Sequence, residues 1–190
     1  MSMSSVYNSQ AFYYVLVIGF AAYTAYYLWK VFQFLSANYK ARKKYLAQYG
    51  TENTKTVNQF WWWTAGYSLL IIYSIYSVVT IDPSIEQAEW FRMAFLFIAL
   101  ILLGQMLVAA VKRSALVGPE AFVVEDAVVL WKSVLNMDPK KRGLQRIVEL
   151  QTTQGKYTLS REMGLVLHKE HEEWKKRRKE AKEKKKEKKK

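Results

Sequence analysis

The sequence predicts a helical membrane protein with three transmembrane helices and a small α+β cytoplasmic domain, which has a short antiparallel sheet and a C-terminal helix. Two observations lead to this class. Apolar residues make up 51% of the 190 residues, and most of them fall in three long runs in the first part of the chain. A soluble core would draw them from the whole sequence. After these runs, short Val-rich segments alternate with turn residues and lead into a charged tail.

The three apolar runs each exceed or match the roughly 20 residues that a helix needs to cross a bilayer core. We expect spans at about 11–34, 60–80 and 90–111, within a transmembrane domain 1–113. No base precedes the first run and no small-residue cleavage pattern follows it, so we interpret it as a retained anchor rather than a signal peptide. Tryptophans near the ends of the runs are the expected interface anchors: Trp29, Trp61, Trp62, Trp63 and Trp90.

The distribution of Lys and Arg predicts the orientation, because bases in short flanks are retained in the cytoplasm. Residues 1–10 contain no base, and the connection 81–89 contains only acids among its charged residues. The third run, in contrast, exits into Lys112 and Arg113. The linker after the first run holds Lys40, Arg42, Lys43, Lys44 and Lys55. The sequence therefore predicts a multi-pass cell-membrane protein with its N-terminus outside and its C-terminus in the cytoplasm.

A small cytoplasmic domain is predicted over 114–174, because Gly118 and Pro119 break the third helix. The run 121–131 is rich in Val and aromatic residues, which favour strands. Its two acids, Glu125-Asp126, are typical of a turn. We therefore expect two short strands on either side of this turn.

A hairpin is predicted next in the same domain. Residues 146–152 and 156–160 flank a short turn that ends in Gly155, a spacing typical of hairpins. The segment 136–143 contains Asn, Asp, Pro and Gly and is expected to be a loop. The domain should then contain three or four antiparallel strands.

From Arg161 onward the pattern becomes helical, and Ser160 is a suitable N-terminal cap. The apolar residues of this helix share a broad face that is expected to pack on the sheet: Met163, Val166, Leu167 and Trp174. The tail 175–190 consists almost entirely of Lys, Arg and Glu, so it has no apolar stripe to bury and is expected to be solvated.

No residue pattern predicts enzyme chemistry, a metal site or a cofactor. The chain has no cysteine, which excludes disulfides and thiolate ligands. His168 and His171 have acids beside them, but their three-residue spacing differs from that of the zinc protease motif, and a solvated helix surface is the favoured interpretation. Glycine-rich phosphate loops and nucleophile elbows are absent. We therefore predict a non-enzymatic protein with no catalytic residue.

Polar residues inside the spans have two interpretations. They are Tyr23, Tyr27, Tyr73, Tyr76 and Gln105. Hydrogen bonding between helices is favoured, because hydroxyl groups need partners in lipid and nearby small residues allow close approach. A polar-lined groove for a lipid or for a partner protein's helix is the alternative.

The tail suggests an acidic partner. Residues 169–190 hold 13 Lys or Arg and 6 Glu, a difference of +7, and the chain has a net charge of +13. Anionic inner-leaflet lipids are the nearest candidates, together with a membrane or cytoplasmic protein. The bases expected to make this contact are Lys175, Lys176, Arg177, Arg178 and Lys179. A solvated tail that also enforces topology is the first interpretation of this charge, attraction to anionic lipids is the second, and electrostatic contact with RNA or the ribosome is the third. Nothing supports sequence-specific nucleic-acid recognition.

After the three apolar runs the chain contains the segments Ala121-Phe-Val-Val-Glu-Asp, Val128-Val-Leu-Trp-Lys, Ile147-Val-Glu-Leu and Lys156-Tyr-Thr-Leu, followed by the closing helix. This order of features resembles small uncharacterised bacterial three-span membrane proteins whose cytoplasmic part is PH-like. The predicted sheet has fewer strands than a seven-stranded PH barrel. The resemblance implies a binding or scaffolding module beneath the membrane and brings no catalytic residues.

The function predicted from these features is that of a membrane adaptor or a regulatory or accessory subunit, which docks a partner on the cytoplasmic face. The alternative is an accessory factor of transport or protein insertion that contacts lipid or the ribosome through the basic tail. The sequence leaves the formation of a homo-oligomer open.

Overall fold

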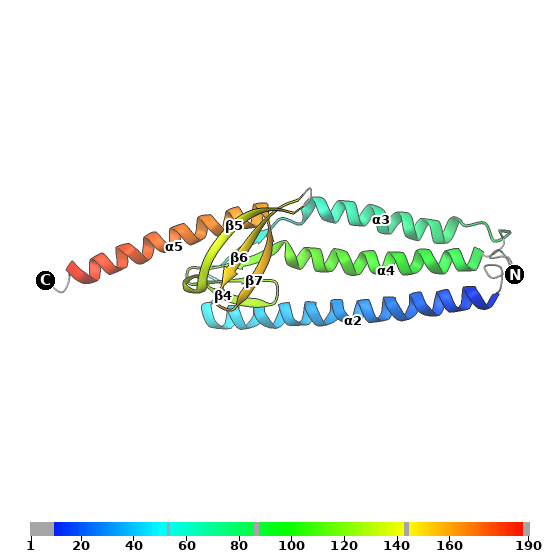
Figure 1. Ribbon diagram of the computed structural model, residues 1–190, viewed down its shortest axis with the longest axis horizontal. Coiled ribbons are helices and arrows are strands. Elements are labelled where there is room, and N and C mark those ends of the chain that lie inside the picture. Colours follow the sequence, from blue (N-terminus) through cyan, green and yellow to red (C-terminus); the bar gives the residue numbers. More distant parts are fainter. Residues whose placement is uncertain (1–9, 53, 86–87, 143–144, 188–190) are drawn as a thin grey trace. The chain divides into compact units, whose positions relative to one another are not determined.

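The computed structural model describes residues 10–52, 54–85, 88–142 and 145–187 (Figure 1). The chain divides into two compact units. The helical unit comprises Met1–Leu35 and Trp61–Ala109, and the strand unit comprises Ser36–Phe60 and Ala110–Lys190. The base-free N-terminal flank and the last three lysines of the tail, which the sequence analysis used, lie outside the described residues.

Three helices in the described part of the chain are long and apolar enough to cross a membrane, as predicted. They are α2 (Gln10–Tyr49), α3 (Trp61–Thr80) and α4 (Ala88–Lys112). Only 6–11% of the residues in their most apolar windows are buried within the protein. A helix that exposes apolar side chains all round is typical of a membrane span rather than of a soluble bundle.

Within the helical unit, α2 and α4 begin at the same end. The Trp90 ring, near the start of α4, stacks on Tyr13 with 5.8 Å between centroids, and Tyr13 is near the start of α2. Further along, a Cβ at Gly104 would lie 2.8 Å from the Tyr27 ring and 3.3 Å from Val31. Glycine therefore allows close approach of these two helices, which is a common way of packing helices in membranes.

Helix α2 extends 15 residues beyond its predicted span, from 34 to 49. Its 40 residues correspond to about 60 Å of helix, about twice the thickness of a bilayer core. The extension belongs to the strand unit and carries the buried residues Asn38, Ala41 and Tyr45 at helical spacing. Ala41 and Tyr45 pack with Leu116, Ala121 and Val123 of the first sheet, which explains why this polar segment stays helical.

The strand unit contains two antiparallel sheets with seven strands among the described residues. The first sheet has the order β1-β2-β3-β4 and the second β5-β6-β7. The strands are β1 (Lys55–Asn58), β2 (Ser114–Val117), β3 (Ala121–Val124), β4 (Ala127–Leu130), β5 (Val134–Arg142), β6 (Gln145–Thr152) and β7 (Gly155–Ser160), with the 3-10 turn η1 (Trp131–Ser133) after β4. The predicted count of three or four strands was therefore too low.

The two predicted strand pairs are confirmed. Strands β3 and β4 pair on either side of Glu125 and Asp126, and Glu125 has a positive φ of 54°. Strands β6 and β7 form the predicted hairpin, with Thr152 opposite Gly155.

The loop predicted at 136–143 was wrong over 136–142, and Gly143 lies outside the described residues. Residues Val134–Arg142 form β5, which pairs with β6 along its length, and Pro139 lies opposite Val148. Because β5 is an edge strand, a proline without an N–H group can be accommodated on its open side. The Asn, Asp and Pro residues were read as turn formers, but pairing with β6 overrides that local preference.

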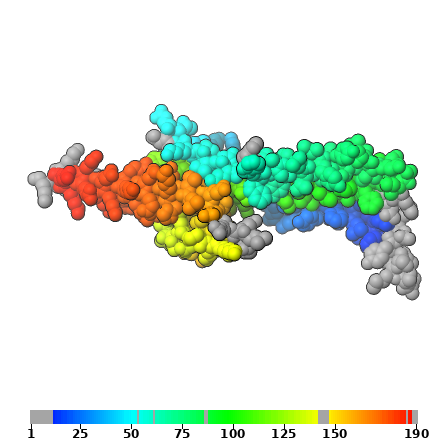
Figure 2. All heavy atoms as spheres, turned by 90° about the horizontal axis from the view of Figure 1, so that it is seen from above, coloured from blue at the N-terminus to red at the C-terminus, as the bar shows by residue number. Residues whose placement is uncertain are grey.

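Helix α5 (Arg161–Glu187) closes the strand unit and begins where predicted. The Met163 N–H donates to Ser160 Oγ at 3.2 Å, which confirms Ser160 as the cap. Met163 and Leu167 are fully buried in a core shared with Phe122, Leu150 and other residues of both sheets. The second half of α5 runs beyond the strands, as Figures 1 and 2 both show.

Candidate docking site

A row of stacked rings connects the core of the strand unit to its surface along α5. Phe122 packs on Trp131 with 4.3 Å between ring centroids, and Trp131 stacks on His171 at 5.8 Å. His171 stacks in turn on Trp174 at 5.7 Å. The guanidinium of Arg178 lies 5.3 Å from the Trp174 ring, which is within cation-π range. The row therefore ends in a positively charged group at the surface.

Trp131 fixes the inner part of this row. It is completely buried, and its Nε1–H donates to the carbonyl oxygen of Gly118 at 2.9 Å. A buried indole needs such a partner for its N–H group. The position of the outer rings thus follows from the packing of the core.

A hollow of about 640 Å³ lies where the row reaches the surface. Helix α5 contributes Trp174, Arg177, Arg178 and Ala181. Other parts of the strand unit contribute Tyr49, Pro119, Glu120, Leu130 and Lys132. Four separate segments meet here: the end of α2, the β2–β3 turn, the end of β4 with η1, and α5. The volume lies within the range of about 300–1,000 Å³ that is usual for ligand-binding clefts.

The four α5 residues have the spacing i, i+3, i+4 and i+7, so they occupy one face of the helix. This face is continuous with the buried face that carries Met163, Leu167 and His171. Past Trp174 the same face presents the guanidinium groups of Arg177 and Arg178 as well as Ala181. Two of the charged groups of the hollow therefore lie on the continuation of the packed face of α5, whereas Lys132 and Glu120 come from other segments.

A second hollow, of about 450 Å³, adjoins the first and shares Pro119 and Arg177 with it. It is more acidic, with Glu52, Glu170 and Glu173 in its wall. Lys55 Nζ forms a salt bridge with Glu170 Oε1 at 3.3 Å there. Part of its charge is thus already neutralised within the protein.

His171 is a buried ring within the row rather than a solvated residue. Burial lowers its pKa below the usual value of 6.5, and nearby Lys175 and His168 lower it further, whereas Glu172 raises it. The folded state therefore favours the neutral form of the His171 ring. Within the described residues, no group of three or more His, Asp or Glu side chains is placed to hold a metal ion.

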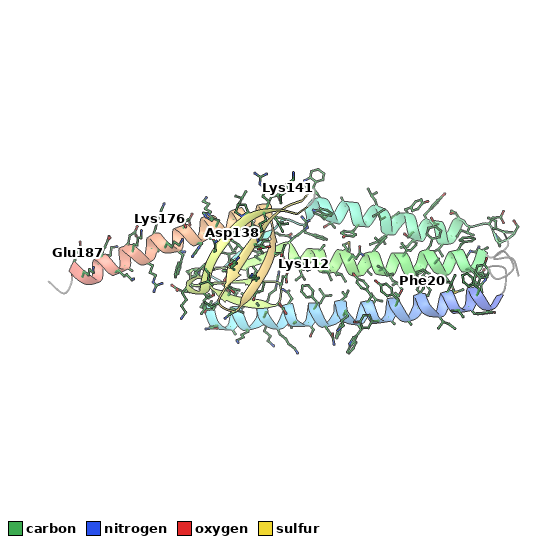
Figure 3. The ribbon with its side chains drawn as sticks, in the orientation of Figure 1. Phe20, Lys112, Asp138, Lys141, Lys176 and Glu187 are labelled. Carbon is green, nitrogen blue, oxygen red and sulfur yellow. The ribbon has the colours of Figure 1, made fainter. Side chains whose placement is uncertain are left out.

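The five predicted contact bases all lie on exposed positions of α5, but they are not equivalent. Arg177 and Arg178 line the hollow, whereas Lys175 forms a salt bridge with Glu172 at 2.9 Å. Lys176 and Lys179 are exposed and do not line it. Figure 3 labels Lys176 on the part of α5 that runs beyond the strands.

The predicted polar residues of the spans lie mostly on outer faces of the helical unit. Tyr23, Tyr73 and Tyr76 are 57%, 63% and 64% exposed, Gln105 is also exposed, and Tyr27 is half-buried near Gly104. The buried hydroxyl residues of the spans are Thr24, Ser74 and Ser77. Hydrogen bonding of the predicted polar residues between helices, and the alternative of a groove for a lipid or for a partner protein's helix, remain predictions.

A small apolar groove of about 150 Å³ lies between α2 and α4. Tyr13, Phe20, Trp90 and Phe97 are among the residues that line it. None of the five polar residues predicted for a groove belongs to its wall.

The predicted interface anchors are mostly outward-facing. Trp29, Trp62 and Trp63 are exposed, and Trp90 packs against Tyr13 and Tyr14. The side chain of Trp61 lies outside the described part of the structure, although its backbone begins α3.

Comparison of the chain with protein-family models, with curated proteins and with solved structures found no significant match. The candidate site therefore rests on its own geometry.

Sequence reasoning identified Arg177 and Arg178 by their charge but missed the rest of the hollow. Tyr49, Glu120 and Lys132 come from distant segments, and no sequence spacing links them. One usable signal was present: Arg178 and Ala181 continue the helical spacing of the apolar face at Trp174.

Proposed function

We propose that the protein is a non-enzymatic membrane adaptor or accessory subunit, anchored by α2, α3 and α4, whose strand unit docks a partner protein in the cytoplasm. The hollow on the strand unit is the observation that carries this proposal. It is concave, it combines aromatic and positively charged side chains, and its walls come from four segments of one folded unit. Concave sites with a few placed polar groups are the usual form of binding sites.

The distribution of bases supports a cytoplasmic strand unit. The linker bases, from Lys40 to Lys55, and the bases that follow α4, Lys112 and Arg113, all belong to this unit. Bases that flank spans are retained in the cytoplasm. The described part of the connection between α3 and α4, 81–85, contains Asp82 and no base, which supports an external position for it.

A PH-like arrangement is part of the proposal. It is supported by the seven strands, divided into sheets of four and three, and by the closing helix α5. Such a module would act by binding, and it requires no catalytic group.

The test is crosslinking in native membranes, followed by purification through an N-terminal tag. Intact protein is compared with a version truncated after Arg113, which keeps all three apolar helices but lacks β2 to α5. We expect a crosslinked partner that is lost on truncation. Equal amounts of both forms in the membrane fraction are required, so that the loss reflects docking and not degradation. If the truncated form still crosslinks the partner, the partner binds to the three apolar helices, and the proposal is contradicted.

A second candidate is an accessory role in transport or protein insertion, with the tail in contact with lipid or the ribosome. The part of α5 that runs beyond the strands supports it, because its described side chains from Lys175 to Glu187 are exposed and mostly basic. Salt-sensitive co-sedimentation with ribosomes, lost on deletion of residues 182–190, is the expected result. Co-sedimentation that survives this deletion would argue against a role for the tail.

A further inference from the structure

Three positively charged side chains line one hollow of the strand unit, and none of them forms a salt bridge with another described residue. Lys132, Arg177 and Arg178 line the 640 Å³ space, and the only acid in its wall is Glu120 among the described residues. The salt bridges of the described strand unit involve other bases, namely Lys55, Lys140 and Lys175. The described wall of the hollow thus carries three bases and one acid, an excess of two positive charges, although Arg177 also borders the acidic second hollow.

Arg178 contacts an aromatic ring that packs on the core. Its guanidinium lies over Trp174, 5.3 Å from the ring centroid, and Trp174 stacks on the buried His171. A guanidinium in such a contact can still offer its N–H groups to the two oxygens of a carboxylate. The contact with the ring restricts the side chain, which lowers the entropic cost of binding.

The walls of the hollow also include apolar surface. Leu130, Ala181 and Pro119 line it together with the ring of Tyr49. A ligand that fits must therefore combine negative charge with at least one apolar group.

We propose that this hollow docks an acidic segment of a partner protein, in which carboxylate side chains meet Arg177, Arg178 and Lys132 beside an apolar side chain. This inference rests on the proposed adaptor function and names the chemistry of the partner. The lining of three bases against one acid, with apolar residues and Tyr49 beside them, is complementary to a protein segment that carries both acidic and apolar side chains.

The first test uses a defined probe. Full-length protein in nanodiscs of zwitterionic phosphatidylcholine is titrated with a short fluorescent peptide of alternating Glu and Leu. Binding is compared with that of the matching Gln and Leu peptide. We expect the Glu peptide to bind at least about tenfold more tightly, because hydrogen bonds between charged groups are stronger than neutral ones. Equal binding of the two peptides would overturn the proposal.

Matched variants locate the site. Arg177→Glu with Arg178→Glu is expected to weaken binding of the Glu peptide by about tenfold or more, since it replaces two attractive charges by repulsive ones. Lys176→Glu with Lys179→Glu makes the same change of net charge on the same helix, away from the hollow, and should weaken binding by less than about threefold. If both double variants lose the same affinity for the Glu peptide, binding depends on the overall charge of the tail and not on the hollow, which would contradict the proposal. Matching melting temperatures of the two variants show that folding is unaffected.

Two further outcomes separate the alternatives. If only the binding of phosphatidylglycerol vesicles is lost in Arg177→Glu with Arg178→Glu, the hollow is a lipid site and the proposal fails. If that variant still crosslinks the partner that truncation after Arg113 removes, the adaptor function stands, but docking occurs elsewhere on the strand unit. Retention of the partner by the truncated form would instead contradict the adaptor function itself.

Discussion

Gly164 lies on α5 in tight contact with Val148 of β6. A Cβ at this position would be 2.4 Å from Cγ2 and 2.5 Å from Cβ of Val148. Replacing glycine by alanine favours an isolated helix by up to about 1 kcal/mol, but overpacking of a core typically costs about 1–3 kcal/mol. The contact with the branched carbon of Val148 leaves little room for adjustment, so the steric cost should exceed the gain in helix propensity.

We therefore expect Gly164→Ala to lower the free energy of unfolding of the strand unit by about 1–2 kcal/mol. Thermal unfolding of the purified protein, followed by near-ultraviolet circular dichroism of its buried Trp131, measures this change. Adding Val148→Ala should recover part of the loss, because it removes Cγ2, the atom nearest to the new methyl group, together with Cγ1, while Cβ stays in place. A Gly164→Ala variant as stable as the original protein would mean that α5 lies further from β6.

Glu125 has a φ of 54° in the turn between β3 and β4, a backbone conformation that is unfavourable for residues with a Cβ. Burial also raises the pKa of its carboxyl group, although nearby Lys112 opposes that shift. Glu125→Gly should be more stable than Glu125→Ala by about 1 kcal/mol, because both variants remove the carboxylate but only glycine relieves the backbone. Urea unfolding of the two variants tests this difference, and equal midpoints would contradict it.

Among the elements, α5 is expected to make the stability of the strand unit depend on pH, through His171. The pKa of His171 is lowered by burial and by Lys175, so the folded state favours the neutral ring. Above its ordinary pKa of 6.5 the ring is neutral in both states and stability is complete. As the pH falls below that value, the unfolded chain binds a proton more readily, and stability decreases.

We expect the melting temperature to fall between pH 7.5 and 5.5, and His171→Phe to reduce this fall while keeping a ring between Trp131 and Trp174. His168→Gln is the control, since His168 is exposed on the same helix. Melting curves at several pH values provide the measurement. An unchanged pH dependence in His171→Phe would assign the effect to other groups.

The elements that could be predicted from the sequence are those set by local contacts. The β6–β7 hairpin has its strands next to each other in the chain, and α5 carries its own cap and apolar face. Strand β1 was missed because it is short and polar, and its pairing partner β2 is more than 50 residues away in the sequence. The extension of α2 carried a readable signal in Asn38, Ala41 and Tyr45, whose spacing is helical.

At the scale of the whole molecule, the division into units depended on contacts that no local pattern contains. The linker after the first span looked like a simple connection, yet β1 pairs with β2 and Asn38 Nδ2 donates to the Glu125 carbonyl oxygen. Residues 36–60 therefore complete the strand unit together with the chain after α4. The hollow was only partly predictable for the same reason. Its positive charge could be predicted from the sequence of the tail, but the residues that form its walls could not.

The orientation in the membrane can be tested with single cysteines, because the chain has none. Ser84 is exposed in the connection between α3 and α4, and Lys179 is exposed on α5. The distribution of bases predicts that these positions lie on opposite sides of the membrane. In intact cells a membrane-impermeant maleimide should label Ser84→Cys and should reach Lys179→Cys only after permeabilisation. The reverse pattern would place the hollow outside the cell, where a cytoplasmic partner cannot reach it, and labelling of both positions in intact cells would exclude three crossings.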